Sequence, residues 1–97
     1  MKYYKITENN ITYDIYQDNY GTKFWYKNGK LHRDDGPAIE YASGTKSWYN
    51  NEYLHRTDGP AIEGADGHKQ YWYNNKYLEF VHSDIELKRY IKLLSIF

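Results

Sequence analysis

Two pairs of histidine and aspartate are the residues of this sequence whose types and spacing could carry out chemistry. His32 precedes Asp35, and His55 precedes Asp58, in two copies of a His-Arg-x-Asp motif. A histidine oriented by a carboxylate can act as a general base. A catalytic group is needed only once, whereas both pairs occur in the same local sequence. We therefore expect the histidines and aspartates to bond backbone groups of the following turn, each arginine to pair with a nearby acid, and the protein not to be an enzyme.

The composition also argues against metal and nucleic-acid chemistry. The chain has no cysteine, and its histidines lack the spacing of common ligand sets, so we expect no metal and no other cofactor. These histidines are His32, His55, His68 and His82. Thirteen basic residues balance thirteen acidic ones, which disfavours the basic field that nucleic acid attracts. A platform for single-stranded nucleic acid remains an alternative, because aromatic residues alternate with Lys23, Lys46 and Lys69.

An internal repeat is the feature of the sequence that predicts its architecture. Residues 21–43 recur as residues 44–66 at a spacing of 23, and both contain Leu-His-Arg-x-Asp-Gly-Pro-Ala-Ile-Glu. A partial third copy spans residues 67–82, with one extra residue before Trp72 that we interpret as a β-bulge. Residues 1–20 are interpreted as a degenerate half-repeat that forms an N-terminal capping hairpin. The whole chain, residues 1–97, is then a single domain.

Each copy predicts a strand, a turn and a second strand. Asparagine-rich pairs supply turns that tolerate positive φ, and Asp-Gly-Pro marks the start of the next strand. The predicted turn pairs are Asn28-Gly29, Asn50-Asn51 and Asn74-Asn75. The fold class is therefore mainly β, an elongated antiparallel sheet of hairpins.

Aromatic residues make up 20% of the chain, which excludes a thick aliphatic core, and strand alternation divides them between two faces. One face is predicted to carry the buried seam of Trp25, Trp48 and Trp72, with Leu31, Leu54, Leu78, Ile39 and Ile62. The opposite face is predicted to carry Tyr26, Tyr49 and Tyr73, with Phe24 beside them and Tyr53 and Tyr77 beyond the turns. Tyrosine and tryptophan give a large rigid contact area at low entropic cost. We therefore predict that the residues on this second face bind a partner.

The last fifteen residues, 83–97, predict an amphipathic helix. Ser83 and Glu86 match a capping box, and the apolar positions follow a helical stripe. These positions are Leu87, Tyr90, Ile91, Leu94 and Phe97. Such a helix can cover the open edge of the last hairpin. Docking of the helix into a partner or a second subunit remains the alternative.

The repeated motif, with Gly-Thr-Lys-x-Trp-Tyr before it, resembles the MORN-type repeat in its Leu-His-Arg-x-Asp-Gly-Pro-Ala variant. The resemblance covers residues 21 to about 78. It implies β-hairpins that stack into an elongated twisted sheet and act as scaffolds, dimerisation modules or, occasionally, lipid binders. Arg33 and Arg56 depart from the commoner pattern, in which glycine follows histidine, so lipid binding does not carry over. Short versions of this kind resemble accessory proteins of phages and of bacteria with AT-rich genomes.

These observations predict a non-enzymatic module that binds another protein. The resemblance and the small size suggest a phage-encoded inhibitor that blocks a host defence protein such as a CRISPR effector nuclease. A self-associating scaffold that forms a homodimer is the main alternative. The N-terminus lacks the apolar segment of a signal peptide, and no apolar run is long enough to span a bilayer. We expect a cytoplasmic protein with no membrane partner and no small-molecule substrate.

Overall fold

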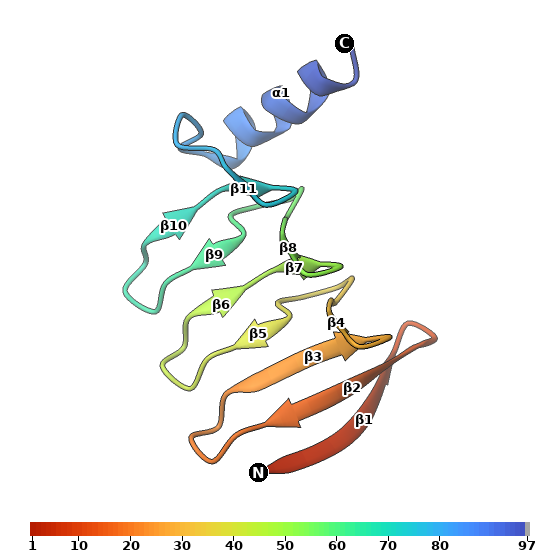
Figure 1. Ribbon diagram of the computed structural model, residues 1–97. Helices are drawn as coiled ribbons and strands as arrows, with labels where there is room; N and C mark the ends of the chain where they lie inside the picture. Colours follow the sequence, from red (N-terminus) through yellow and green to blue (C-terminus); the bar gives the residue numbers. More distant parts are fainter. Residues whose placement is uncertain (97) are drawn as a thin grey trace.

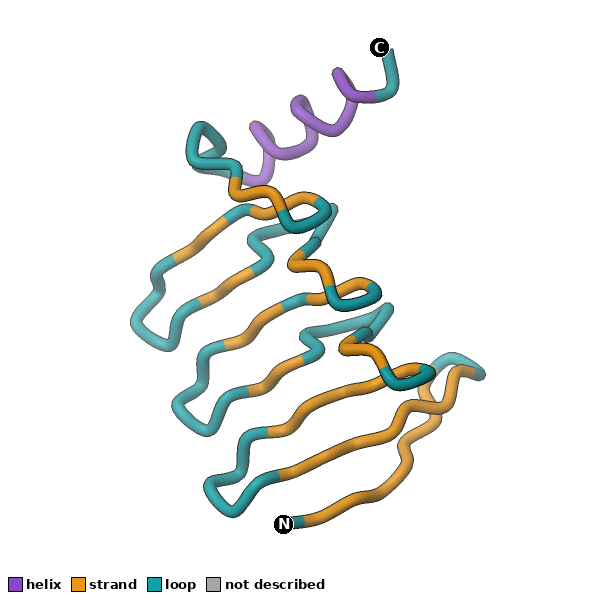
Figure 2. Tube along the Cα trace, in the orientation of Figure 1, coloured by secondary structure: helices purple, strands orange, loops and turns teal. Residues whose placement is uncertain are grey.

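The fold is mainly β: antiparallel strands are the predominant regular structure, and one helix follows them, as the sequence predicts. The structure is a computed structural model that describes residues 1–96. Figure 1 shows the strands stacked along one long axis with the helix at the far end, and Figure 2 shows the loops that join them. Within the described residues the molecule measures 43 × 30 × 19 Å, so the array is elongated and thin.

One continuous sheet runs through the molecule in the order β1-β2-β3-β5-β6-β9-β10. Its strands are β1 (Lys2–Glu8), β2 (Ile11–Gln17), β3 (Lys23–Lys27), β5 (Ile39–Glu40), β6 (Lys46–Ser47), β9 (Ile62–Glu63) and β10 (Lys69–Gln70). The first two strands form the expected N-terminal hairpin, with Tyr3 opposite Tyr16 and Tyr4 opposite Ile15. Asn9 and Asn10 turn this hairpin at φ 52° and 66°, values that asparagine tolerates better than most residues.

Three short hairpins project from one side of this sheet. They pair β3 with β4 (Lys30–Leu31), β7 (Tyr49–Asn50) with β8 (Tyr53–Leu54), and β11 (Trp72–Tyr73) with β12 (Lys76–Tyr77). Each turn places two consecutive residues at positive φ, as a two-residue hairpin requires. The middle turn consists of Asn51 and Glu52, one residue later than predicted, and Glu52 adopts φ 74°.

The third hairpin keeps the 23-residue register, so the predicted extra residue and β-bulge before Trp72 are wrong. Trp72 pairs with Tyr77 in the same way that Tyr49 pairs with Leu54. The Leu78 N–H donates a hydrogen bond to the Tyr71 carbonyl at 2.8 Å. In the two preceding units the equivalent donors are His55 and His32, which bond the carbonyls of Trp48 and Trp25. Tyr71 therefore occupies the tryptophan position of the third unit, and Trp72 occupies the tyrosine position.

The buried residues form two clusters, one at each end of the array. The first core cluster consists of Tyr13, Ile15, Trp25 and Ala38, and the second consists of Tyr71, Leu78, Val81 and Leu87. The edge of the Tyr13 ring meets Trp25 with the ring centroids 5.4 Å apart, a favourable geometry for aromatic pairs.

The predicted buried seam is only partly correct. Trp25, Leu78 and Ile39 are buried as expected. Ile39 pairs with Phe24 and Ser47, and Leu31 pairs with Tyr26, so these aliphatic side chains lie on the tyrosine face and not beside the tryptophans.

The helix α1 (Asp84–Leu94) covers the end of the sheet beyond β11 (Figure 1). The Ser83 side chain accepts a hydrogen bond from the Glu86 N–H at 3.2 Å, and the Glu86 carboxylate accepts one from the His82 N–H at 3.2 Å, so the predicted capping interaction forms. Leu87 is fully buried against the second core cluster. Within the described residues, α1 is too short and too polar to cross a lipid bilayer.

Candidate protein-binding face

The first histidine is a structural link between two units. The His32 ring is buried, its Nδ1 accepts a hydrogen bond from the Asn51 N–H at 3.0 Å, and its Nε2 lies 2.7 Å from Asp34 Oδ1. The carboxylate partner is therefore Asp34 and not Asp35, whose side chain bonds Asn9. With both ring nitrogens engaged, His32 joins one hairpin to the next and has no free nitrogen to accept a substrate proton.

The second histidine repeats the link but lacks a carboxylate. His55 Nδ1 accepts a hydrogen bond from the Asn74 N–H at 3.0 Å, again a residue of the following hairpin. Thr57 stands where the first unit has Asp34, and the His55 ring meets the Tyr73 ring at 4.7 Å. Burial lowers the pKa of His55, which favours the neutral ring that this hydrogen bond needs. The sequence prediction placed the histidine bonds within their own turns, whereas they reach the next unit.

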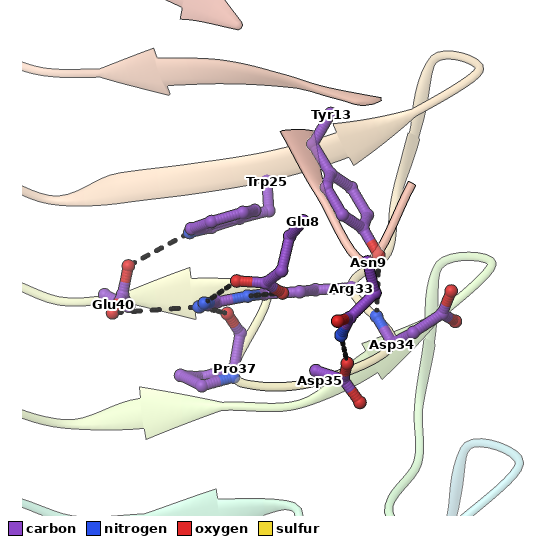
Figure 3. Close-up of polar contacts among 9 residues, drawn as sticks. All are labelled: Glu8, Asn9, Tyr13, Trp25, Arg33, Asp34, Asp35, Pro37 and Glu40. Atoms are coloured by element: carbon purple, nitrogen blue, oxygen red, sulfur yellow. Dashed lines mark hydrogen bonds and ion pairs between the residues drawn. The ribbon is translucent and has the colours of Figure 1, made fainter. Parts of the chain in front are cut away.

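Arg33 lies over Trp25, with its guanidinium carbon 3.6 Å from the ring centroid. Figure 3 shows the polar contacts that hold it there. Two nitrogens donate to the Glu8 carboxylate at 3.1 and 2.8 Å, and a third contact reaches the Pro37 carbonyl at 3.2 Å. The hydrogen bond from Arg33 lowers the pKa of Glu8 below its usual range. The predicted pairing of this arginine with an acid therefore forms, but the acid comes from β1.

Arg56 repeats this arrangement 23 residues later. Its guanidinium carbon lies 3.8 Å from the centroid of Trp48, and it donates to Asp58 at 2.8 Å and to the Pro60 carbonyl at 3.0 Å. A β-carbon on Gly59 would lie 2.8 Å from the same guanidinium carbon. The glycine of the motif is therefore needed to make room for the arginine, and the arginine covers the tryptophan.

A groove of about 600 Å³ separates the two arginine loops. Its lining includes Trp48, Tyr49, His55, Arg56 and Asp58. Arg56 and Asp58 already pair with each other, and His55 Nδ1 already accepts a hydrogen bond. Among residues 1–96, no three His, Cys, Asp or Glu side chains are grouped so that they could hold a metal ion. These loops are organised to support the sheet.

Exposed and half-buried aromatic side chains gather on the side of strands β1 to β3 that faces away from the first core cluster. Tyr3, Tyr16 and Phe24 lie opposite one another in adjacent strands, with ring centroids 5.0 and 5.7 Å apart. Tyr26 lies two residues beyond Phe24 and therefore on the same side. We call Tyr3, Tyr16, Phe24 and Tyr26 the aromatic face. The core residues Ile15 and Trp25 pair at the intervening positions, so they point to the opposite side of the sheet.

The aromatic face is open to solvent and is hollowed. Tyr3 is 75% exposed, and the other three rings are half-buried. A cavity of about 480 Å³ lies beside these rings, lined by Tyr3, Tyr16, Tyr26, Asp14, Ile15 and Gly29. Lys5 and Asp14 lie on the same side of the sheet, with Asp14 opposite Tyr26, and they form an ion pair at 2.5 Å. The surface therefore combines aromatic rings with one paired acid and base.

The six residues predicted to bind a partner fall into three groups. Phe24 and Tyr26 belong to the aromatic face, and Tyr53 and Tyr77 are 53% and 45% exposed on the other two hairpins. Tyr49 packs against the first core cluster, and burial raises its pKa. Tyr73 packs against the second core cluster and against Tyr90 of α1, with ring centroids 6.1 Å apart. Tyr49 and Tyr73 thus have structural contacts.

Tyr3 and Tyr16 are the residues that the sequence prediction missed. They lie in the degenerate N-terminal segment, for which no face was assigned. The Asn9-Asn10 pair in the sequence is sufficient to predict that Tyr3 and Tyr16 are neighbours. A two-residue turn at these positions sets Glu8 opposite Ile11 and therefore Tyr3 opposite Tyr16.

Comparison with family models, with curated proteins and with solved structures gave no match. The resemblance to MORN-type repeats remains an expectation from the sequence motif. The function of the chain must therefore be inferred from the contacts and surfaces described above.

Proposed function

We propose that the protein is a non-catalytic module that binds another protein through the aromatic face. The observation that supports this function is the position of Tyr3, Tyr16 and Phe24, which form a partly exposed ladder on the side of the sheet opposite the first core cluster. Aromatic rings in this position can be covered by a partner without disturbing Trp25 and the residues packed on it. Tyrosine-rich patches of this kind are enriched at the centres of protein interfaces.

The polar residues of the repeated motif are engaged in structural hydrogen bonds, which supports binding rather than catalysis. His32, Arg33 and Arg56 all donate or accept bonds that hold adjacent strands and loops together. The ion pair between Lys5 and Asp14 leaves the aromatic face close to neutral. A neutral apolar surface suits a protein partner better than a polyanion such as nucleic acid, whose affinity depends on unpaired lysine and arginine.

The sequence resemblance suggests the setting in which this binding operates. We extend the proposal to a phage-encoded inhibitor that acts in the host cytoplasm and blocks a defence protein such as a CRISPR effector nuclease. An inhibitor of this size needs a rigid surface that is already formed before binding, because rigid side chains lose little entropy on contact. Tyr16 and Phe24 meet this condition, since each packs against a neighbouring ring.

Affinity capture with matched tyrosine variants tests the proposal. The immobilised protein is compared with the double variant Tyr16→Ala and Tyr26→Ala and with the control Tyr20→Ala, which removes an 87% exposed tyrosine outside the aromatic face. We expect one host protein to be retained by the wild type and by the control but lost by the double variant, whose unfolding curve should stay close to that of the wild type. Equal retention by all three proteins would contradict the proposal.

A further inference from the structure

Large apolar side chains are exposed around the C-terminal helix, although its inner side already packs on the sheet. Leu87 is fully buried and Tyr90 and Ile91 are partly buried against the second core cluster. The exposed side chains and their exposed fractions are Phe80 54%, Ile85 64%, Leu93 54%, Leu94 44% and Ile96 68%. Two of the five, Phe80 and Leu93, line the same groove, and contiguous apolar surface marks interaction sites.

Part of this patch forms a groove beside α1. The groove has a volume of about 240 Å³ and is lined by Phe80, Val81, Glu86, Arg89, Tyr90 and Leu93. The Phe80 and Tyr90 rings meet edge to face at 5.4 Å, so the aromatic wall of the groove is already formed. Glu86, Arg89 and Leu93 follow one another at helical spacings of three and four residues, which places an acid, a base and an apolar group on one side of α1.

We propose that the occupant of this groove is α1 of a second copy of the chain, packed antiparallel across a two-fold axis. In this arrangement Leu93 of each copy enters the groove between Phe80 and Glu86 of the other. Arg89 of each copy then lies near Glu86 of the other, which gives two equivalent ion pairs. A two-fold interface requires a surface that is complementary to itself, and an acid and a base on the same face as a leucine and its groove satisfy this requirement.

The distribution of charge along α1 selects the antiparallel orientation. Asp84 and Glu86 lie in the first turn, whereas Arg89 lies at the midpoint of the helix and Lys92 in its last turn. Antiparallel packing brings the acidic end of each helix to the basic end of the other and also opposes the two helix dipoles. Parallel packing would place like charges together. Among residues 1–96, neither Glu86 nor Arg89 takes part in an ion pair, and the one side-chain hydrogen bond of Glu86 there, from the His82 N–H, uses a single carboxylate oxygen.

This inference is independent of the proposed function, since α1 and the aromatic face lie at opposite ends of the array (Figure 1). A dimer through α1 would leave both aromatic faces free. Two free faces on one particle allow bivalent attachment to a partner that is itself repeated, and bivalent attachment raises the effective affinity without new contacts.

Sedimentation equilibrium of the full chain tests the proposal. We expect the wild type to be a dimer that dissociates on dilution. Leu93→Glu and Arg89→Glu should each raise the dimer dissociation constant at least about 30-fold, the effect of losing a central interface residue. Lys88→Glu makes the same charge change on another side of α1 and should leave the constant within about threefold of wild type. Circular dichroism checks that each variant keeps its helix and sheet.

Mixed variants test the orientation of the two helices. Arg89→Glu and Glu86→Lys should each dimerise weakly alone, and an equimolar mixture should recover dimers, because the two exchanged charges face each other only in the antiparallel pair. A wild type that stays at the monomer mass at every concentration would overturn the proposal. Dimers that survive both Leu93→Glu and Arg89→Glu would also overturn it, since the interface would then lie elsewhere. If Leu93→Glu fails to fold, the comparison of Arg89→Glu with Lys88→Glu still decides.

Discussion

Arg33 lies flat on Trp25, with its guanidinium carbon 3.6 Å from the ring centroid. The contact explains why residues of the repeated motif occur together. Gly36 leaves room for the guanidinium group, the Pro37 carbonyl accepts its hydrogen bond, and Glu40 accepts one from the Trp25 ring nitrogen at 3.0 Å. The motif therefore describes one arginine and the groups that surround it, and these contacts support the sheet.

Replacement of Arg33 by alanine should destabilise the fold strongly. The variant Arg33→Ala loses the contact with Trp25 and leaves the Glu8 carboxylate without its charged partner. We expect the free energy of unfolding to fall by about 2–4 kcal/mol, measured by urea denaturation. The control Lys30→Ala, at an exposed site on β4, should change it by less than about 0.5 kcal/mol. Equal effects of the two substitutions would show that Arg33 has no special role.

The glycine beneath the arginine provides a second test of the same contact. Alanine at position 36 would place its β-carbon 2.8 Å from the guanidinium carbon of Arg33, so Gly36→Ala should displace the arginine from Trp25. We expect a loss of about 1–3 kcal/mol in urea denaturation. In the Arg33→Ala background the same substitution should cost less than about 0.5 kcal/mol, because the clash is then absent. Additive losses in the double variant would refute the steric explanation.

The histidine links predict how stability depends on pH. Burial lowers the pKa of His55 in the folded protein below the ordinary value of 6.5, so the unfolded chain takes up its proton first as the pH falls. Stability from this group is therefore complete above pH 6.5 and is lost as the pH falls from there through the folded pKa. Protonation also places a proton on Nδ1, which can then no longer accept the Asn74 hydrogen bond.

Urea denaturation between about pH 8 and pH 5 measures this loss. The variant His55→Asn has no titrating group at this position, so its stability should fall less than that of the wild type over the same range. Any contribution from His32 is common to both proteins and cancels in the difference. Parallel stability curves for the two proteins would show that His55 does not titrate as its burial implies.

Much of the fold follows from the sequence because its signals are local. The asparagine turns act through their own backbone angles, and Ser83 and Glu86 cap the helix through contacts within one turn. The register of the third unit was harder to predict. Tyr71 and Trp72 are both aromatic, so the residue types alone do not show which of them is equivalent to Trp25 and Trp48. The 23-residue spacing decides in favour of Tyr71, which is buried at 4% exposure.

The candidate site was less predictable, because its residues come together only through pairing between distant strands. Phe24 and Tyr26 could be found from alternation within β3, but the ladder is completed by Tyr3 and Tyr16 of the N-terminal hairpin. Likewise, the His32 ring bonds Asn51 of the next unit, nineteen residues away, which no local motif indicates. Local spacing identifies the side chains that share a strand face, whereas the neighbours of each strand depend on the whole sheet.

The third unit has a different residue at the position that histidine holds in the first two units. His32 and His55 each accept an N–H from the hairpin that follows, whereas Leu78, 23 residues after His55, has no acceptor and packs against Leu87 of α1. The two junctions between hairpins are therefore polar, whereas the junction between the last hairpin and the helix is apolar. Leu78 lies at the boundary where the array of hairpins gives way to the helix.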